Sequence, residues 1–132
     1  PPERPVFSCR RVLVAWDRSA RAARAASDAL PFMRQAEAVT VLSIHGEKEL
    51  PRTVPGADLA HYLARHGVRV SARDAQAQGG DVARTLRTEA AALEADLLVM
   101  GGYAHSRLRQ LVFGGVTQSL LGDCPVPLLL SH

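Results

Sequence analysis

The sequence predicts a single α/β domain built on a doubly wound, five-stranded parallel sheet with helices on both faces. Short apolar segments alternate along the 132 residues with segments whose apolar residues recur every three or four positions. This alternation is typical of strands joined by helical crossovers. Two of the apolar segments are hydrophobic at almost every position, as strands buried on both faces are. Right-handed crossovers then place helices on each side of the sheet.

The first part of the chain predicts two strands separated by a helix. Residues 11–16 form an apolar run that ends at Asp17, and a second apolar run covers residues 39–44. Between these runs, Ser19 is a suitable N-cap for a helix. Pro31 falls inside that helix, so we expect it to kink the helix or remove one of its hydrogen bonds.

The middle of the chain predicts a connection, a short helix and a half-exposed strand. Residues 45–55 are polar or contain proline, and the segment after them has helical spacing up to Gly67, a typical C-terminal stop. Residues 68–73 then alternate between apolar and polar side chains. Such alternation favours a strand at the margin of the sheet.

A second buried strand follows another helix. Gly79 and Gly80 interrupt the chain, and Asp81 is placed to cap a helix with one apolar stripe. Residues 97–100 are all apolar and end at Gly101. We therefore expect a fully buried strand there.

The C-terminal part predicts one more helix and an edge strand. Apolar spacing after Val116 indicates a helix that Gly122 ends, and residues 126–130 form a last apolar run. Pro127 lies inside this run and cannot donate a backbone hydrogen bond. The final strand is therefore expected at an edge of the sheet.

Composition and charge restrict the class of protein. Hydrophobic residues make up 47% and charged residues 22% of the chain, as in ordinary globular domains. No apolar run reaches the roughly 20 residues of a membrane span, and residues 1–10 lack the apolar core of a signal peptide. Cys9 and Cys124 have no metal-ligand spacing and suggest no disulfide framework. We therefore expect a cytoplasmic protein without a structural metal.

The basic residues argue against a nucleic-acid function. The net charge of +3 arises from arginines spread along the chain rather than gathered in a block. Arg18, Arg21 and Arg24 recur at three-residue spacing. We interpret this stripe as the solvated face of a helix.

Two strand ends are candidates for a ligand site. In open sheets of this class, ligands bind beyond the carboxyl ends of the strands, where the strand order reverses. The two most apolar strands end at Asp17 and at Gly101, and such strands are expected side by side in the centre of the sheet. A pocket between them would then hold both residues.

The segment from Gly101 to Thr117 has glycines at both of its ends. Glycine lets backbone N–H groups approach phosphate oxygens, and the start of a helix adds unpaired donors. His105, Ser106, Arg107 and Arg109 within the segment are further candidates for contacts with phosphate. The alternative is that the glycines only end a strand and begin a helix.

This segment resembles the phosphate-binding loop of the universal stress protein family, which reads Gly-x2-Gly-x9-Gly-(Ser/Thr). The corresponding positions here are Gly101, Ala104, Gly114 and Gly115, so the second glycine and the final hydroxyl residue are replaced. The resemblance covers residues 10–132, with residues 1–9 as a leader or linker, and the chain is similar to the C-terminal half of tandem bacterial members. It implies the strand order 3-2-1-4-5.

The resemblance also implies a set of nucleotide-binding residues. At the adenosine end it places Ala15, Trp16, Asp17, Ile44, Met100 and Gly101. Along the loop and at the phosphate end it places Tyr103, Ala104, Gly114, Gly115, Val116 and Thr117.

The implied function is that of a stress-response switch or sensor. The expected ligand is ATP or AMP, with Mg²⁺ accompanying ATP, and the expected assembly is a homodimer formed through the edge strand at residues 126–131. No efficient catalysis is expected, although slow ATP hydrolysis stays open. Two alternatives remain. One is a nucleotide-free dimeric interaction module in which Ala104 and Gly115 mark a structural loop. The other is an enzyme of a related adenine-nucleotide superfamily.

Overall fold

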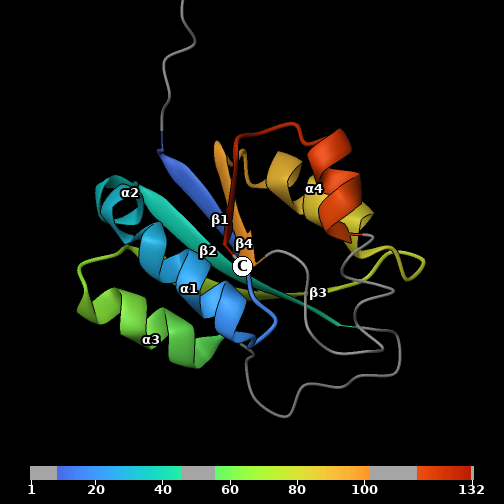
Figure 1. The fold of residues 1–132 in the computed structure, drawn as a ribbon. Helices are drawn as coiled ribbons and strands as arrows, with labels where there is room; N and C mark the ends of the chain where they lie inside the picture. Colours follow the sequence, from blue (N-terminus) through green and yellow to red (C-terminus); the bar gives the residue numbers. More distant parts are fainter. Residues whose placement is uncertain (1–8, 46–55, 102–115, 132) are drawn as a thin grey trace, which may run out of the picture.

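The computed structural model describes residues 9–45, 56–101 and 116–131, and these form a three-layer α/β structure (Figure 1). The strands are β1 (Arg11–Ala15), β2 (Ala38–His45), β3 (Val70–Gln76), β4 (Leu97–Gly101) and β5 (Leu128–Ser131). The helices are α1 (Ala20–Asp28), α2 (Leu30–Gln35), α3 (Ala57–Arg65) and α4 (Val82–Ala92), and residues 116–122 are also helical. The strands pair in parallel in the order β3-β2-β1-β4-β5. The predicted fold class and strand order are confirmed.

The centre of the sheet is buried on both faces. Val12, Leu13 and Val14 of β1 are at most 2% exposed. Because successive side chains point to opposite faces, Val12 and Val14 join the core under α1, α2 and α3, whereas Leu13 joins the core under α4 and residues 116–122. This double burial is the physical reason for the continuous apolar runs in the sequence.

The predicted first helix is two helices. The Ser19 Oγ accepts a hydrogen bond from the Ala22 N–H at 3.0 Å, so Ser19 is the expected N-cap. The helix ends before Ala29, and Pro31 lies in the first turn of α2. A proline is tolerated there because the N–H that it lacks has no partner within the helix.

The predicted arginine stripe of α1 has two members instead of three. Arg18 precedes α1 and has a positive φ of 65°. It therefore lies outside the helix, and Arg21 and Arg24 are the members of the stripe that α1 carries.

Two strands begin later than predicted. Val68 is buried, and its N–H donates to the Leu63 carbonyl oxygen at 3.1 Å, so it closes the end of α3 instead of starting β3. Pro127 lies before β5, and only its carbonyl oxygen joins the ladder, where it accepts from the Leu98 N–H at 2.9 Å. β5 is an edge strand, as predicted.

The predicted connection over residues 45–55 is only partly described. His45 is the last residue of β2, so the connection begins after it. The remainder lies outside the described residues. In the part of the chain that the structure describes, no helix is long and apolar enough to cross a bilayer.

Candidate functional site

The carboxyl ends of β1 and β4 lie side by side at the centre of the sheet. Their pairing runs from Val12 opposite Leu97 to Val14 opposite Val99. The residues that follow on each strand therefore meet at one edge. This arrangement brings the two predicted strand ends, at Asp17 and Gly101, to the same edge of the sheet.

Asp17 holds the turn between β1 and α1. One of its carboxylate oxygens, Oδ1, accepts a hydrogen bond from the Ser19 N–H at 2.9 Å. Ser19 in turn caps α1. Among the described residues, the second carboxylate oxygen of Asp17 has no hydrogen-bond donor. Asp17 thus supports the turn before α1 through one of its two carboxylate oxygens.

Gly101 is fixed by packing against α1. A Cβ at this position would lie 2.7 Å from the Ala22 nitrogen and 2.8 Å from the Arg21 carbonyl carbon. Both are backbone atoms, which cannot move aside as a flexible side chain does. The end of β4 can therefore meet the first turn of α1 only because residue 101 has no side chain.

The predicted adenosine-end residues divide between the two faces of the sheet. Met100 is buried on the face that α4 covers, and Ala15 and Ile44 pack against the same cluster. Trp16 packs against the opposite cluster, under α1 and α3. The structure thus brings Ala15, Ile44 and Met100 to one side and places Trp16 on the other.

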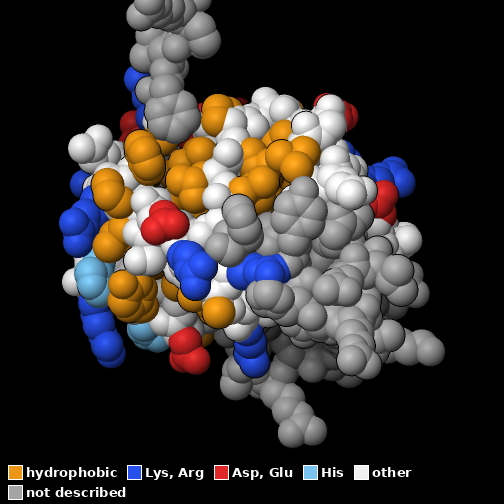
Figure 2. Space-filling view, viewed as in Figure 1, with side chains coloured by type: hydrophobic (Ala, Val, Ile, Leu, Met, Phe, Trp, Pro, Cys, Tyr) orange, Lys and Arg blue, Asp and Glu red, His pale blue; other side chains and the backbone are white. Residues whose placement is uncertain are grey.

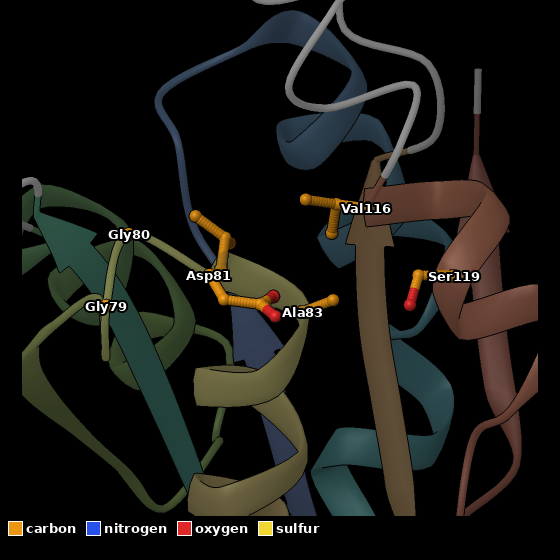
Figure 3. A pocket seen from close by; sticks show the side chains of 7 residues that line it. Gly79, Gly80, Asp81, Ala83, Val116 and Ser119 are labelled. Carbon is orange, nitrogen blue, oxygen red and sulfur yellow. The ribbon is translucent and has the colours of Figure 1, made fainter.

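A cleft of about 310 Å³ opens on the α4 side (Figure 3). It lies between the start of α4 and residues 116–122, and Val116 points across it toward α4. The cleft is lined by Gly79, Gly80, Asp81, Val82, Ala83, Val116 and Ser119. The first turn of α4 and the helical residues 116–119 therefore border it.

The turn before α4 is held by hydrogen bonds on both sides of its two glycines. The Thr85 hydroxyl donates to the Asp81 carbonyl oxygen at 2.8 Å and accepts from the Gln78 N–H at 2.9 Å. The Asp81 carboxylate caps α4, as predicted, by accepting from the Arg84 N–H at 3.0 Å. Between these anchors, Gly79 and Gly80 have φ values of 58° and 74°. Such left-handed conformations favour glycine.

The predicted phosphate end is described in part. Val116 lines the cleft, whereas Thr117 is 1% exposed and is not among the lining residues. The other predicted loop residues lie outside the described residues; they are Tyr103, Ala104, His105, Ser106, Arg107, Arg109, Gly114 and Gly115.

Sequence reasoning missed most of the cleft. It assigned Gly79, Gly80 and Asp81 to a chain break and a helix cap, and it gave Ser119 no role. The paired glycines before a capped helix were the available signal, but the partner wall comes from a segment more than 30 residues later. In the described ranges, no group of three or more His, Cys, Asp or Glu residues is arranged to hold a metal ion.

The structure has a doubly wound parallel sheet with a cleft near the carboxyl ends of its central strands. It therefore belongs to the class of α/β proteins whose ligands bind at that edge of the sheet. Within this class, the chain belongs to the universal stress protein family, whose family model matches residues 8–132. The strand order that the sequence resemblance implied is the order observed here.

Solved structures of this family have the same fold. The universal stress protein UspA from Lactobacillus plantarum is 15% identical with a TM-score of 0.71, over 95% of this chain and 99% of that chain. A universal stress protein from Archaeoglobus fulgidus is 18% identical with a TM-score of 0.71, over 93% of this chain and 44% of that chain. A universal stress protein solved in complex with cAMP is 18% identical with a TM-score of 0.66, over 93% of this chain and 97% of that chain. No curated protein matches the chain in sequence.

Proposed function

We propose that this protein binds an adenine nucleotide, ATP or AMP, at the carboxyl edge of β1 and β4 and acts as a stress-response switch. The observation that carries the proposal is the cleft beside this edge. Ala15, Ile44 and Met100 pack on the same side of the sheet as Val116, which lines the cleft. A volume of about 310 Å³ falls at the lower end of the usual range for small-molecule sites.

The proposed orientation follows the chemistry of the two ends. Apolar side chains of Ala15, Ile44 and Met100 suit a purine ring, and the second carboxylate oxygen of Asp17 suits a ribose hydroxyl. The phosphates, with Mg²⁺ in the case of ATP, would then point toward residues 114–117. A relative of the same fold has been solved with a cyclic adenine nucleotide, which supports this ligand class.

We also propose a homodimer formed through residues 126–131. Hydrophobic side chains gather on the face of the molecule where β5 runs (Figure 2), and Leu128, Leu129 and Leu130 are only half-buried. An edge strand also has unpaired backbone groups that a second copy can pair with. Sedimentation at micromolar concentration should therefore give the mass of a dimer, and a monomer would contradict this part of the proposal.

The proposal places the function in the domain of residues 10–132 and in the cytoplasm. It includes no efficient catalysis, because the sequence carries no Gly-x4-Gly-Lys-(Ser/Thr) loop and no nucleophile elbow. ATP turnover above that of a binding-deficient variant would contradict this.

A second candidate is a nucleotide-free interaction module of the same fold. The environment of Gly101 favours this candidate. The close approach of the Ala22 backbone is enough to explain a glycine at this position, and no ligand is needed to explain it. The replacement of the family's glycine and hydroxyl residue by Ala104 and Gly115 points the same way.

The two candidates differ in a direct binding experiment. Protein purified from its host is heated, and the released supernatant is examined by mass spectrometry for ATP, ADP and AMP. Calorimetry with millimolar ATP then measures binding to the emptied protein. Bound nucleotide or a measurable affinity supports the switch. Empty protein that also fails to bind ATP supports the interaction module.

Substitution of Gly114 tests the assigned phosphate end. We expect Gly114→Val to abolish ATP binding because a branched side chain would occupy the space of a phosphate. Gly122→Val is the matched control, since a Cβ on Gly122 would have no neighbouring atom within 4 Å. Calorimetry should show binding by the control alone. Equal ATP affinity in both variants would remove residue 114 from the site.

A further inference from the structure

Arg87 joins α4 to the segment that forms the other wall of the cleft. It lies on α4 one turn after Ala83, which lines the cleft. Its Nη2 donates to the Ser119 carbonyl oxygen at 2.8 Å and to the Ser119 Oγ at 2.7 Å, and its Nε donates to the Asp123 carbonyl oxygen at 2.9 Å. Two of these acceptors belong to Ser119, within the helical residues 116–122, and the third belongs to Asp123, just after them. A guanidinium fork of this kind fixes orientation as well as distance.

Ser119 links this fork to the cleft. It lines the cleft together with Val116, and its hydroxyl accepts the shortest of the three hydrogen bonds. Val116 and Leu120 are buried in the core and hold the helical segment against the sheet. These apolar contacts are non-directional. The hydrogen bonds from Arg87 add a directional restraint between this segment and α4.

The side chain of Arg87 is well placed to act as such a restraint. It is 27% exposed, so protein atoms cover most of the side chain. The carboxylate of Asp123 lies 3.9 Å from the Nε and is 86% exposed, which makes this ion pair a minor contribution. The carbonyl and hydroxyl acceptors on the neighbouring segment therefore dominate the interaction.

We infer that Arg87 is a positioning residue for the phosphate end of the nucleotide site. Its guanidinium holds Ser119, and with it Val116, at a set distance from the start of α4, and so determines the width of the cleft. The inference rests on the proposed nucleotide function. Arg87 acts through Ser119 and does not contact the nucleotide.

The test compares two ligands and two arginines of the same helix. Calorimetry measures the affinities for ATP and for adenosine in the full chain and in the variants Arg87→Met, Arg87→Lys and Arg84→Met. Arg84 is the matched control, because it lies three residues earlier on α4, is exposed, and has a guanidinium without a partner among the described residues. Hydrogen exchange of residues 117–122 and of β1 is followed in the same samples.

The expected result is selective for phosphate. Arg87→Met should weaken ATP binding by about tenfold and adenosine binding by less than about threefold, as for coupling through one intermediate residue. Arg87→Lys should fall between, because an ammonium group cannot form the fork. Arg84→Met should stay within about twofold of the unchanged protein. Exchange should speed up in residues 117–122 of Arg87→Met while β1 stays protected.

Other outcomes overturn the inference in distinguishable ways. If the unchanged protein binds ATP and Arg87→Met binds it equally well, or loses ATP and adenosine affinity in equal measure, Arg87 is not a positioning residue. If the unchanged protein binds neither ligand, the proposed function fails and the role of Arg87 fails with it. If β1 exchange shows that Arg87→Met is unfolded, the ratio of ATP to adenosine affinity in Arg87→Lys decides.

Discussion

The two sides of the sheet use glycine at the carboxyl edge in opposite ways. On the side of α1 and α3, a Cβ on Gly101 or Gly56 would lie 2.7 Å from a neighbouring atom. On the side of α4, Gly79 and Gly80 have no heavy atom within 4 Å of that position, and they border the cleft. The first side is closed by close packing, whereas the second side is open.

This difference separates two reasons for a glycine. At Gly101 the reason is steric, because backbone atoms of α1 occupy the space of a side chain. At Gly79 and Gly80 the reason is conformational, because positive φ angles disfavour other residues while the surrounding space is free. The free space on the α4 side is what a ligand can fill. The steric and conformational cases predict substitution effects of different size.

Gly101→Ala should have the largest effect on stability. Its methyl group would overlap the Ala22 nitrogen and the Arg21 carbonyl carbon, so β4 and α1 would have to separate. We expect a loss of about 2 to 3 kcal/mol in the free energy of unfolding, as for an overpacked core. Urea denaturation followed by circular dichroism measures this loss.

Gly122→Ala is the control for that measurement. Gly122 is exposed and helical, and no atom lies near its Cβ position. Alanine there should be neutral or stabilise by up to about 1 kcal/mol. A Gly101→Ala variant as stable as this control would show that the closed side has room at Gly101, and the distinction between the two sides would be lost.

The sequence was informative about Gly101 only in part. Four apolar residues followed by a glycine correctly predicted a buried strand and its end. The reason for the glycine could not be predicted, because the atoms that exclude a side chain belong to α1, almost 80 residues earlier in the chain. A glycine that suits a phosphate and a glycine that suits a helix backbone look the same in one sequence.

Gly80→Ala should have a smaller effect, from backbone strain alone. Gly67 has a similar φ of 82°, also with nothing within 4 Å, but it lies at the end of α3, before β3. Alanine at either position should lower the free energy of unfolding by about 1 kcal/mol. Calorimetry with ATP should separate them, because only the methyl group at residue 80 enters the cleft. Equal ATP affinities in Gly67→Ala and Gly80→Ala would exclude the turn before α4 from the nucleotide site.

The candidate site was predicted less completely than the fold. Periodicity and capping residues identify strands and helices because these signals are local, and Ser19 and Asp81 cap helices as expected. The cleft depends on the distance between α4 and residues 116–122, which Arg87 and Ser119 set across more than 30 residues of chain. Local patterns contain no information about that distance.

The smallest effect concerns Cys9, which packs against the core of the closed side. Burial, and to a lesser degree the Asp96 carboxylate, raises the pKa of the Cys9 thiol. A raised pKa lowers the thiolate fraction near neutral pH. In a Cys124→Ser background, the reaction of iodoacetamide with Cys9 should therefore be slower than its reaction with the free thiol of glutathione. Asp96→Asn removes the lesser cause, and the rate should rise by less than about threefold and stay below that of glutathione. If Cys9 in Asp96→Asn reacts as fast as glutathione, charge and not burial protects the thiol. Water would then reach Cys9 on the side of α1 and α3.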